Sequence, residues 1–223
     1  MKACRLVSLT LKFIRSSLRS GLTERQVARE IKKYLFSHGA AKLAFPVIVA
    51  CGQSSASPHH WPTSKTIQTN DLVLIDIGCV IDGLRSDITR TFFIGQPNPI
   101  WLKTYRQVLI AQEKALKFLR PPTVLSREVD AVARNYFKNL KLDKHFIHGL
   151  GHGIGRAIHQ PPKLSPKAKH QLVKPGDVVT IEPGLYFKNK FGIRIEDTVV
   201  KTKSGYKYLT HFPKDLKSVT IDK

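Results

Sequence analysis

The chain has 223 residues, 42% of them hydrophobic, and its 37 Lys and Arg against 16 Asp and Glu give a formal net charge of +21. This length suits one compact domain, residues 1–223, with a sizeable core. No apolar run approaches the ~18 residues that span a bilayer. The three cysteines, none of them in a CxxC pair, indicate a reducing compartment and argue against a structural zinc site. We therefore expect a cytoplasmic protein without a membrane span.

The positive charge is large enough to attract RNA, anionic lipid or acidic proteins weakly and without specificity. Basic residues are spread from Lys2 to Lys223, however, with no long uninterrupted block. A generally basic surface is therefore the favoured interpretation, with such anionic partners as the alternative.

The first twenty residues, MKACRLVSLTLKFIRSSLRS, are basic, rich in serine and free of acid, which is also how a transit peptide looks. Apolar residues nevertheless recur at steps of three and four, a spacing that predicts an amphipathic helix facing a core. They are Cys4, Val7, Leu11, Ile14 and Leu18. We favour the folded helix over a targeting segment.

The next elements are a helix and two strands. A capping-box pattern at Thr23 and Gln26 predicts the start of a helix that ends near Gly39. The segment FPVIVACG predicts a strand, and LVLIDI at 72–77, apolar on both faces, predicts a buried strand. Across a turn at Asp82-Gly83, SDITRTFFIG is expected to form its hairpin partner.

The second half of the chain echoes the first. Apolar spacing predicts a helix from Ile100 to Leu119 and another, capped by Ser126, to about Leu140. A proline- and lysine-rich loop is expected at 161–175, and the segments DVVTIEP and FGIRIEDTVV predict strands. In each half a capping residue precedes a helix with Val and Tyr seven positions apart. This faint duplication predicts a pseudo-symmetric domain with a site between its halves.

The segment HGLGHGIG, residues 148–155, places His148 and His152 four positions apart among four glycines. Glycine costs ~1 kcal/mol relative to alanine in a helix, so we expect a strand or tight loop. In an extended chain these two residues share a face, and glycine lets another group come close. Without acidic neighbours, a pair of hydrogen-bonded structural histidines is the preferred interpretation.

Acidic residues occur at paired positions in the first predicted hairpin. A two-residue turn at Asp82-Gly83 places Asp76 opposite Thr89 and makes Asp87 its diagonal neighbour, ~7–8 Å away at the backbone. Both carboxylates then point from the same face. Their side chains are therefore expected to converge on a shared ion.

A second predicted hairpin, centred on Asn189, places Glu182 directly opposite Glu196, ~4.5–5.5 Å apart at Cβ. Like charges that face each other destabilise a sheet unless a cation compensates them. Four acids and one imidazole suit two divalent cations, which carboxylates bridge at ~3.5–4 Å. An arginine network through Arg85, Arg90 and Arg194 would explain any single acid, but the paired geometry favours a two-metal site.

Six motifs in this order resemble the pita-bread metallopeptidase family (M24): SPHHWPT, LIDIG, SDITRTF, HGLGHGIG, TIEPGLY and GIRIEDTVV. The ending GIRIED stands where methionine aminopeptidases have a glutamate followed by His-Thr, and it indicates the Xaa-Pro peptidase branch, prolidase and aminopeptidase P. The resemblance covers about Ala3 to Thr210. It implies an α+β pita-bread (creatinase/aminopeptidase) fold with pseudo-two-fold symmetry and a curved antiparallel sheet flanked by helices, here as the catalytic domain without the family's N-terminal domain.

The resemblance also implies a role for each ligand. Asp76 would chelate one metal ion, Asp87 and Glu196 would bridge both, and His152 and Glu182 would complete the shell of the other. Glu182 would in addition serve as the general base. The two ions are expected to be divalent, with Mn, Co, Zn and Fe as open alternatives.

Four further residues are placed near the substrate by the resemblance. His59 and His159 match histidines that contact the scissile peptide and the tetrahedral intermediate. His148 is expected beside the ligands or the substrate, and Arg194 is expected to orient the neighbouring glutamate. We interpret His60 as an exposed loop residue, although an exchange of roles with His59 is open.

The implied function is hydrolysis of the N-terminal Xaa-Pro bond of peptide substrates, as an aminopeptidase or a dipeptidase. Leu84 and Gln160 depart from residues frequent in the family, which weakens the assignment of the substrate and leaves the ligands untouched. One alternative is a methionine aminopeptidase. Another is a non-catalytic module that binds RNA, the ribosome or a protein, although five retained ligands favour an enzyme. Monomer and homodimer both stay open.

Overall fold

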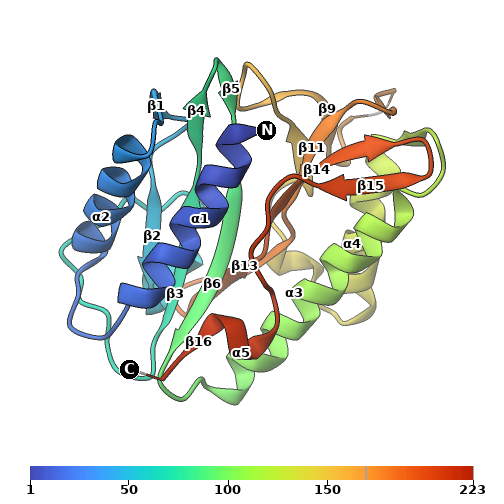
Figure 1. The fold of residues 1–223 in the computed structure, drawn as a ribbon. Coiled ribbons are helices and arrows are strands. Elements are labelled where there is room, and N and C mark those ends of the chain that lie inside the picture. The colour runs from blue at the N-terminus through green and yellow to red at the C-terminus, as the bar shows by residue number, and fades with distance from the viewer. Residues whose placement is uncertain (169, 223) are drawn as a thin grey trace.

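The computed structural model describes residues 1–168 and 170–222. Within them two halves repeat one order of elements, a pair of helices followed by three antiparallel strands. The first half contains α1 (Lys2–Ser17), α2 (Glu24–Ser37), β2 (Ile48–Cys51), β3 (Leu72–Ile77) and β6 (Ile88–Ile94). The second half contains α3 (Pro99–Phe118), α4 (Ser126–Asn139), β8 (Gly151–Gly153), β11 (Val178–Ile181) and β14 (Asp197–Thr202). In Figure 1 one helix pair lies at the left of the molecule and the other at the right, with strands of both halves between them.

Each half contributes one main sheet. The first has the strand order β16-β6-β3-β2 and the second β15-β14-β11-β8-β9, and every neighbouring pair is antiparallel except β16 with β6. Smaller sheets join β1, β4 and β5, β7 and β10, and β12 and β13. The remaining elements are β1 (Lys42–Leu43), β4 (Cys79–Ile81), β5 (Leu84–Arg85), β7 (Val124–Leu125), β9 (Gln160–Leu164), β10 (Leu172–Val173), β12 (Gly184–Phe187), β13 (Phe191–Arg194), β15 (Gly205–Tyr208), α5 (Leu216–Val219), β16 (Thr220–Ile221) and 3-10 turns at Gly52–Ala56 and Asp143–His145.

The predicted helices are present, and one predicted cap is wrong. Thr23 and Gln26 form the capping box at the start of α2, with both reciprocal hydrogen bonds in place. Ser126, by contrast, is the first residue of α4, whose cap is Leu125. The Ser126 hydroxyl is buried and has no hydrogen-bond partner in the described part of the chain, because the chain enters the helix one residue earlier than the sequence pattern indicated.

Two predictions for the strands also need correction. The segment FGIRIEDTVV forms two strands, β13 and β14, which part at Ile195 and Glu196. The expected loop at 161–175 is partly extended, since it includes most of β9 and all of β10; residue 169 lies outside the described residues. The break between β13 and β14 lies where the chain leaves one sheet for the other.

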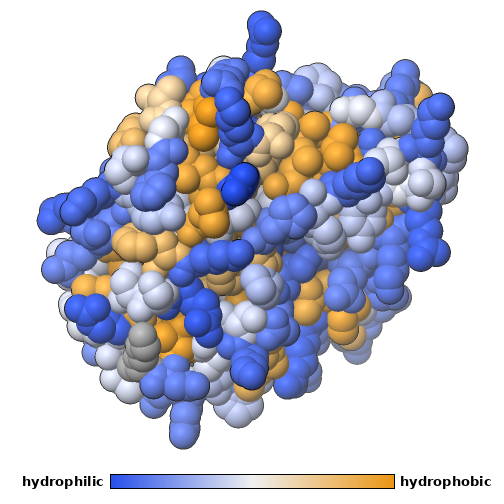
Figure 2. Space-filling view, viewed as in Figure 1, coloured by the Kyte–Doolittle hydropathy of each residue, from blue (hydrophilic) through white to orange (hydrophobic). Residues whose placement is uncertain are grey.

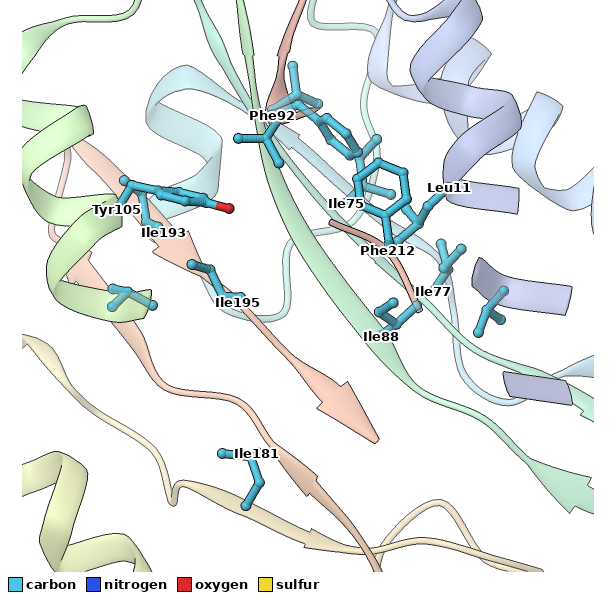
Figure 3. Packing of buried hydrophobic residues seen from close by; sticks show 14 of the residues in the cluster. Leu11, Ile75, Ile77, Ile88, Phe92, Tyr105, Ile181, Ile193, Ile195 and Phe212 are labelled. Carbon is cyan, nitrogen blue, oxygen red and sulfur yellow. The ribbon is translucent and has the colours of Figure 1, made fainter. Parts of the chain in front are cut away.

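The core lies between the helices and the sheets. Every member of the apolar stripe predicted for α1 is at most 1% exposed. Figure 3 shows Leu11 of α1 next to residues of β3 and β6, with Phe92 close to Phe212; these two rings meet edge to face with centroids 5.6 Å apart. The packing places β3 and β6 near α1; β3 carries Asp76, and Asp87 lies directly before β6.

The surface mixes hydrophilic and apolar residues. Figure 2 shows hydrophilic side chains over most of one face, with apolar ones gathered in its upper half. No helix among the described residues is long and apolar enough to cross a membrane.

Candidate metal centre

The first hairpin has the predicted register. Asp82 and Gly83 form its turn with φ of 52° and 73°, values that suit the tight turns joining adjacent strands. Asp76 in β3 faces Thr89 in β6, and Asp87 lies directly before β6. Both carboxylates reach the same cavity, as the diagonal arrangement predicted.

The second hairpin keeps its predicted register but is interrupted at the two glutamates. Gly184 faces Arg194 in one ladder, and Ile181 faces Asp197 in the other, so the same register runs on both sides of Glu182 and Glu196. In the gap, the Glu182 N–H donates to Leu150 O at 2.8 Å and the Glu196 N–H donates to Thr89 O at 3.1 Å. The glutamates therefore leave the ladder, Glu182 for Leu150 directly before β8 and Glu196 for Thr89 of β6, which brings Glu196 to the first half of the molecule.

His152 is carried by the short strand β8, in agreement with the predicted strand or tight loop. A Cβ at Gly151 would overlap the carbonyl oxygen of Thr180, and a Cβ at Gly153 would overlap that of Pro161. Only glycine allows β8 to fit between β9 and β11 at this distance. The close fit also lets the Thr180 hydroxyl accept a hydrogen bond from the His152 N–H at 3.1 Å.

All nine residues singled out for the site line one cavity of about 540 Å³. They are His59, Asp76, Asp87, His148, His152, His159, Glu182, Arg194 and Glu196. Ligand atoms of Asp87, His152 and Glu196 all lie within 4.8 Å of one another. The Nε2 atom of His152 is 3.2 Å from Glu182 Oε1 and 3.8 Å from Asp87 Oδ2.

Three carboxylate oxygens in this cluster are buried without a donor among residues 1–168 and 170–222: Asp76 Oδ1, Asp87 Oδ1 and Glu196 Oε1. Burial, together with the charges of Glu196 and Asp76, raises the pKa of Asp87 well above its usual range. Burial and the charges of Glu182 and Asp76 do the same to the pKa of Glu196. Hard oxygen ligands that converge with one imidazole fit divalent cations. Such cations would balance the negative charge of the carboxylates beyond what the guanidinium of Arg194 balances.

Glu182 differs from the other three acids. Burial alone would raise its pKa, but the hydrogen bond and charge of His152 outweigh burial and lower the pKa to about 2. Its Oε1 also accepts a hydrogen bond from the Thr180 hydroxyl at 2.9 Å. The carboxylate is therefore ionised and held in one orientation at neutral pH.

Arg194 makes different contacts from those predicted. Its Nη2 donates to Asp76 Oδ2 at 2.6 Å and its Nε donates to the Thr89 hydroxyl at 3.0 Å. The Thr89 hydroxyl in turn donates to Glu196 Oε2 at 2.6 Å. Arg194 thus orients Asp76 directly and the neighbouring glutamate only through Thr89, because β13 ends at Arg194 and the Glu196 backbone turns away to bond Thr89.

Tyr186 was missed by the sequence reading. Its hydroxyl accepts from Arg194 Nη1 at 2.7 Å and lies 3.0 Å from His148 Nε2. Burial raises the pKa of this phenol to about 12. Tyr186 lies four positions after Glu182 within the motif TIEPGLY, and because such positions share a face in an extended chain, this spacing was the available signal. His148 is consequently held at the cavity wall by Tyr186.

The two substrate-side histidines lie at the wall of the same cavity. The rings of His159 and His152 meet edge to face with centroids 4.3 Å apart. Burial and the neighbouring His152 lower the pKa of His159. His59 is exposed and lies on the segment between β2 and β3. It lines the cavity, and among the described residues it makes no hydrogen bond to the five predicted metal ligands.

The interpretation of His60 as an exposed loop residue is wrong. Its side chain is 16% exposed, and its Nε2 lies 2.8 Å from Oε2 of the fully buried Glu24. Glu24 also accepts from the Cys51 N–H, the Thr63 N–H and the Thr63 hydroxyl. Glu24 was missed because it reads as an ordinary first-turn acid of α2; it ties α2 to the loop that carries His59.

Comparison with known proteins agrees with this geometry. The model of metallopeptidase family M24 matches residues 1–203. A Xaa-Pro dipeptidase of Pyrococcus furiosus is 39% identical over 215 residues, 96% of this chain and 61% of the relative. A Xaa-Pro dipeptidase of Lactobacillus helveticus is 38% identical over 206 residues, 92% of this chain and 55% of the relative.

Solved structures give the same result. The crystal structure of an X-Pro aminopeptidase from Thermotoga maritima has a TM-score of 0.93 and 33% identity, and the match covers 99% of this chain and 61% of that one. Prolidase from Pyrococcus furiosus has a TM-score of 0.91 and 38% identity, over 95% of this chain and 62% of the other. The predicted pita-bread fold is thereby confirmed. The chain spans about three fifths of the length of these relatives.

Proposed function

The chain belongs to metallopeptidase family M24, and from that premise we propose that it hydrolyses the bond between the first residue of a peptide and a following proline. The observation that carries the proposal is the convergence of three donorless carboxylate oxygens with His152 in one cavity. The names of the relatives, Xaa-Pro dipeptidase and X-Pro aminopeptidase, support proline as the second residue.

Two divalent ions would be held by the five predicted ligands. Asp76 would chelate one ion, Asp87 and Glu196 would bridge both, and His152 and Glu182 would complete the shell of the other. Bound divalent ions polarise a substrate carbonyl and lower the pKa of water. The carboxylate-rich set accepts Mn, Co, Zn or Fe.

The side chains would move the protons. Glu182, ionised and oriented by Thr180 and His152, would accept a proton from the attacking water and deliver it to the leaving proline nitrogen. His59 and His159, at the wall of the same cavity, would donate hydrogen bonds to the oxygen of the scissile carbonyl as negative charge develops on it.

A proline ring suits the apolar part of the cavity. Phe45, Ile48 and Ile158 line it together with the polar cluster. The Xaa-Pro bond is a tertiary amide without an N–H, so a site that offers apolar contact there loses no hydrogen bond. Prolyl peptides are therefore the substrate class that fits this wall.

The proposal is tested with metal-stripped protein reloaded with Mn²⁺ or Co²⁺. We expect cleavage after the first residue of an Xaa-Pro dipeptide or an Xaa-Pro tripeptide, and none of Met-Ala-Ser. The variant Asp87→Ala should lose activity, whereas Glu113→Ala, which removes an exposed acid of α3, should keep it. Cleavage of Met-Ala-Ser alone would establish a methionine aminopeptidase. No turnover with any metal would establish a non-catalytic module.

Three further expectations stay predictions. They are a single catalytic domain, a location in the cytoplasm and the choice between monomer and homodimer. The cysteines, free and buried in the structure, fit a reducing compartment.

A further inference from the structure

A second hollow adjoins the cavity that holds the metal ligands. It has a volume of about 340 Å³ and lies between the outer face of α2 and the segment that carries Trp61 and Pro62. Pro46 and Trp61 line both the cavity and this hollow. The hollow, which we call the α2 groove, therefore shares part of its wall with the cavity of the candidate active site.

The α2 groove is lined by three cations. Arg25, Arg29 and Lys32 follow one another at steps of four and three along α2, a spacing that places them on one helix face. All three are exposed. Like charges at these steps destabilise a helix slightly, and an anionic occupant would offset that repulsion.

No carboxylate occurs among the described residues that line the α2 groove. The first acid of α2, Glu24, points inward to His60 and Thr63. The second, Glu30, lines a different hollow between α1 and α2. The positive charge of the groove is therefore left to solvent and to ligands.

The wall of the groove is fixed by hydrogen bonds. The Arg25 N–H donates to Thr63 O at 3.0 Å, and Arg25 Nε donates to Pro62 O at 3.4 Å. Glu24 holds the same segment from the inside through His60 and Thr63. Trp61 is 69% exposed on this anchored segment, and a large aromatic side chain presented in this way is typical of a binding surface.

The direction of a bound peptide connects the two hollows. An enzyme that removes the first residue holds the amino end of its substrate at the metal ligands, so the rest of the peptide leaves through the mouth. Pro46 and Trp61 lie at that mouth and are both exposed. A peptide that passes over them would reach the α2 groove, which they also line.

We infer that the α2 groove binds acidic side chains downstream of the scissile bond, so that Xaa-Pro peptides followed by Asp or Glu are preferred substrates. This inference rests on the proposed function. It assigns part of the excess positive charge of the chain to substrate selection.

The test compares two hexapeptides, Ala-Pro-(Gln)4 and Ala-Pro-(Glu)4, with the metal-loaded protein. Because one exposed ion pair changes affinity by up to about fivefold, we expect kcat/KM to be at least about threefold higher for the acidic peptide at low salt. The ratio should approach one in about 1 M NaCl, where screening shortens to ~3 Å.

Two variants with equal loss of charge separate the groove from the general charge of the protein. The double variant Arg29→Gln, Lys32→Gln removes two of the three positive charges of the groove and keeps the contact of Arg25 with the loop. It should bring the ratio of kcat/KM for the acidic peptide to that for the neutral peptide close to one. Lys33→Gln with Lys207→Gln changes two exposed lysines that do not line the groove and should keep the ratio.

The outcomes distinguish the two levels of the argument. Cleavage of both hexapeptides with a ratio of one, or a ratio that both variant pairs reduce equally, overturns the inference and leaves the proposed function in place. Cleavage of neither hexapeptide by protein that cleaves an Xaa-Pro dipeptide overturns the inference and leaves the proposed function in place. Cleavage of neither the hexapeptides nor the dipeptide overturns both.

Discussion

Replacing Glu24 by glutamine perturbs the anchor of the loop that carries His59. The carboxylate is fully buried and receives four donors at 2.7 to 2.9 Å, one on Oε1 and three on Oε2. A glutamine can keep the three donors on its carbonyl oxygen only by turning its NH2 group toward the Cys51 N–H. One buried donor is then left unsatisfied, at a cost of about 1–3 kcal/mol, and the three remaining bonds lose a charged acceptor.

The pKa shift of Glu24 gives a similar value for its contribution to the free energy of folding. Burial alone would raise the pKa of Glu24, but the hydrogen bonds from Cys51, His60 and Thr63 outweigh it and lower the pKa from 4.5 to about 2. That shift corresponds to roughly 3 kcal/mol of folding free energy. Because the pKa is lower in the folded state, this contribution is complete above about pH 4.5 and is lost as the pH falls toward 2. Roughly half of it should remain at pH 3.

Urea unfolding of the metal-free protein, followed by circular dichroism, measures both quantities. Glu24→Gln should lower the free energy of unfolding by about 3 kcal/mol at pH 7, and the difference from the parent protein should shrink as the pH falls to 3. Glu30→Gln, which removes an exposed acid of the same helix, should change stability by less than about 0.5 kcal/mol. A loss below about 1 kcal/mol at pH 7, or one that does not vary with pH, would refute the role assigned to Glu24.

Three further changes should have defined effects. Gly151→Ala should cost several kcal/mol of stability, since its Cβ would overlap a β11 carbonyl oxygen, whereas Gly155→Ala meets only the flexible end of a side chain; thermal melts compare the two. Thr89→Val, which removes the hydroxyl bound to Glu196, should lower kcat/KM by about 10- to 100-fold with an unchanged circular dichroism spectrum. Removal of the metal by a chelator should lower Tm. Mn²⁺ at about 100 times its Kd should raise the free energy of unfolding again by about 3 kcal/mol, and the variant Asp87→Ala should show no such increase.

Local patterns were sufficient for the elements and for the register of the hairpins. Positive φ at Asp82 and Gly83 follows from the preference of Asp-Gly for a two-residue turn, and the turn determines that Asp76 faces Thr89. The stripe from Cys4 to Leu18 predicted the buried face of α1 for the same reason, since helical periodicity is a property of neighbouring residues. Ser126 failed as a cap because the entry of a helix depends on the preceding chain as well as on the capping residue.

The sequence by itself determined the fold class, the two hairpins and the set of acids and histidines that meet in the cavity. Only the tertiary structure decided which donors those groups receive. Glu24 binds a loop about 36 positions away through His60, Arg194 reaches Asp76 across 118 positions, and Glu196 leaves its own ladder for Thr89. Contacts of this kind depend on how the two halves pack against each other, and no periodicity along the chain encodes that packing.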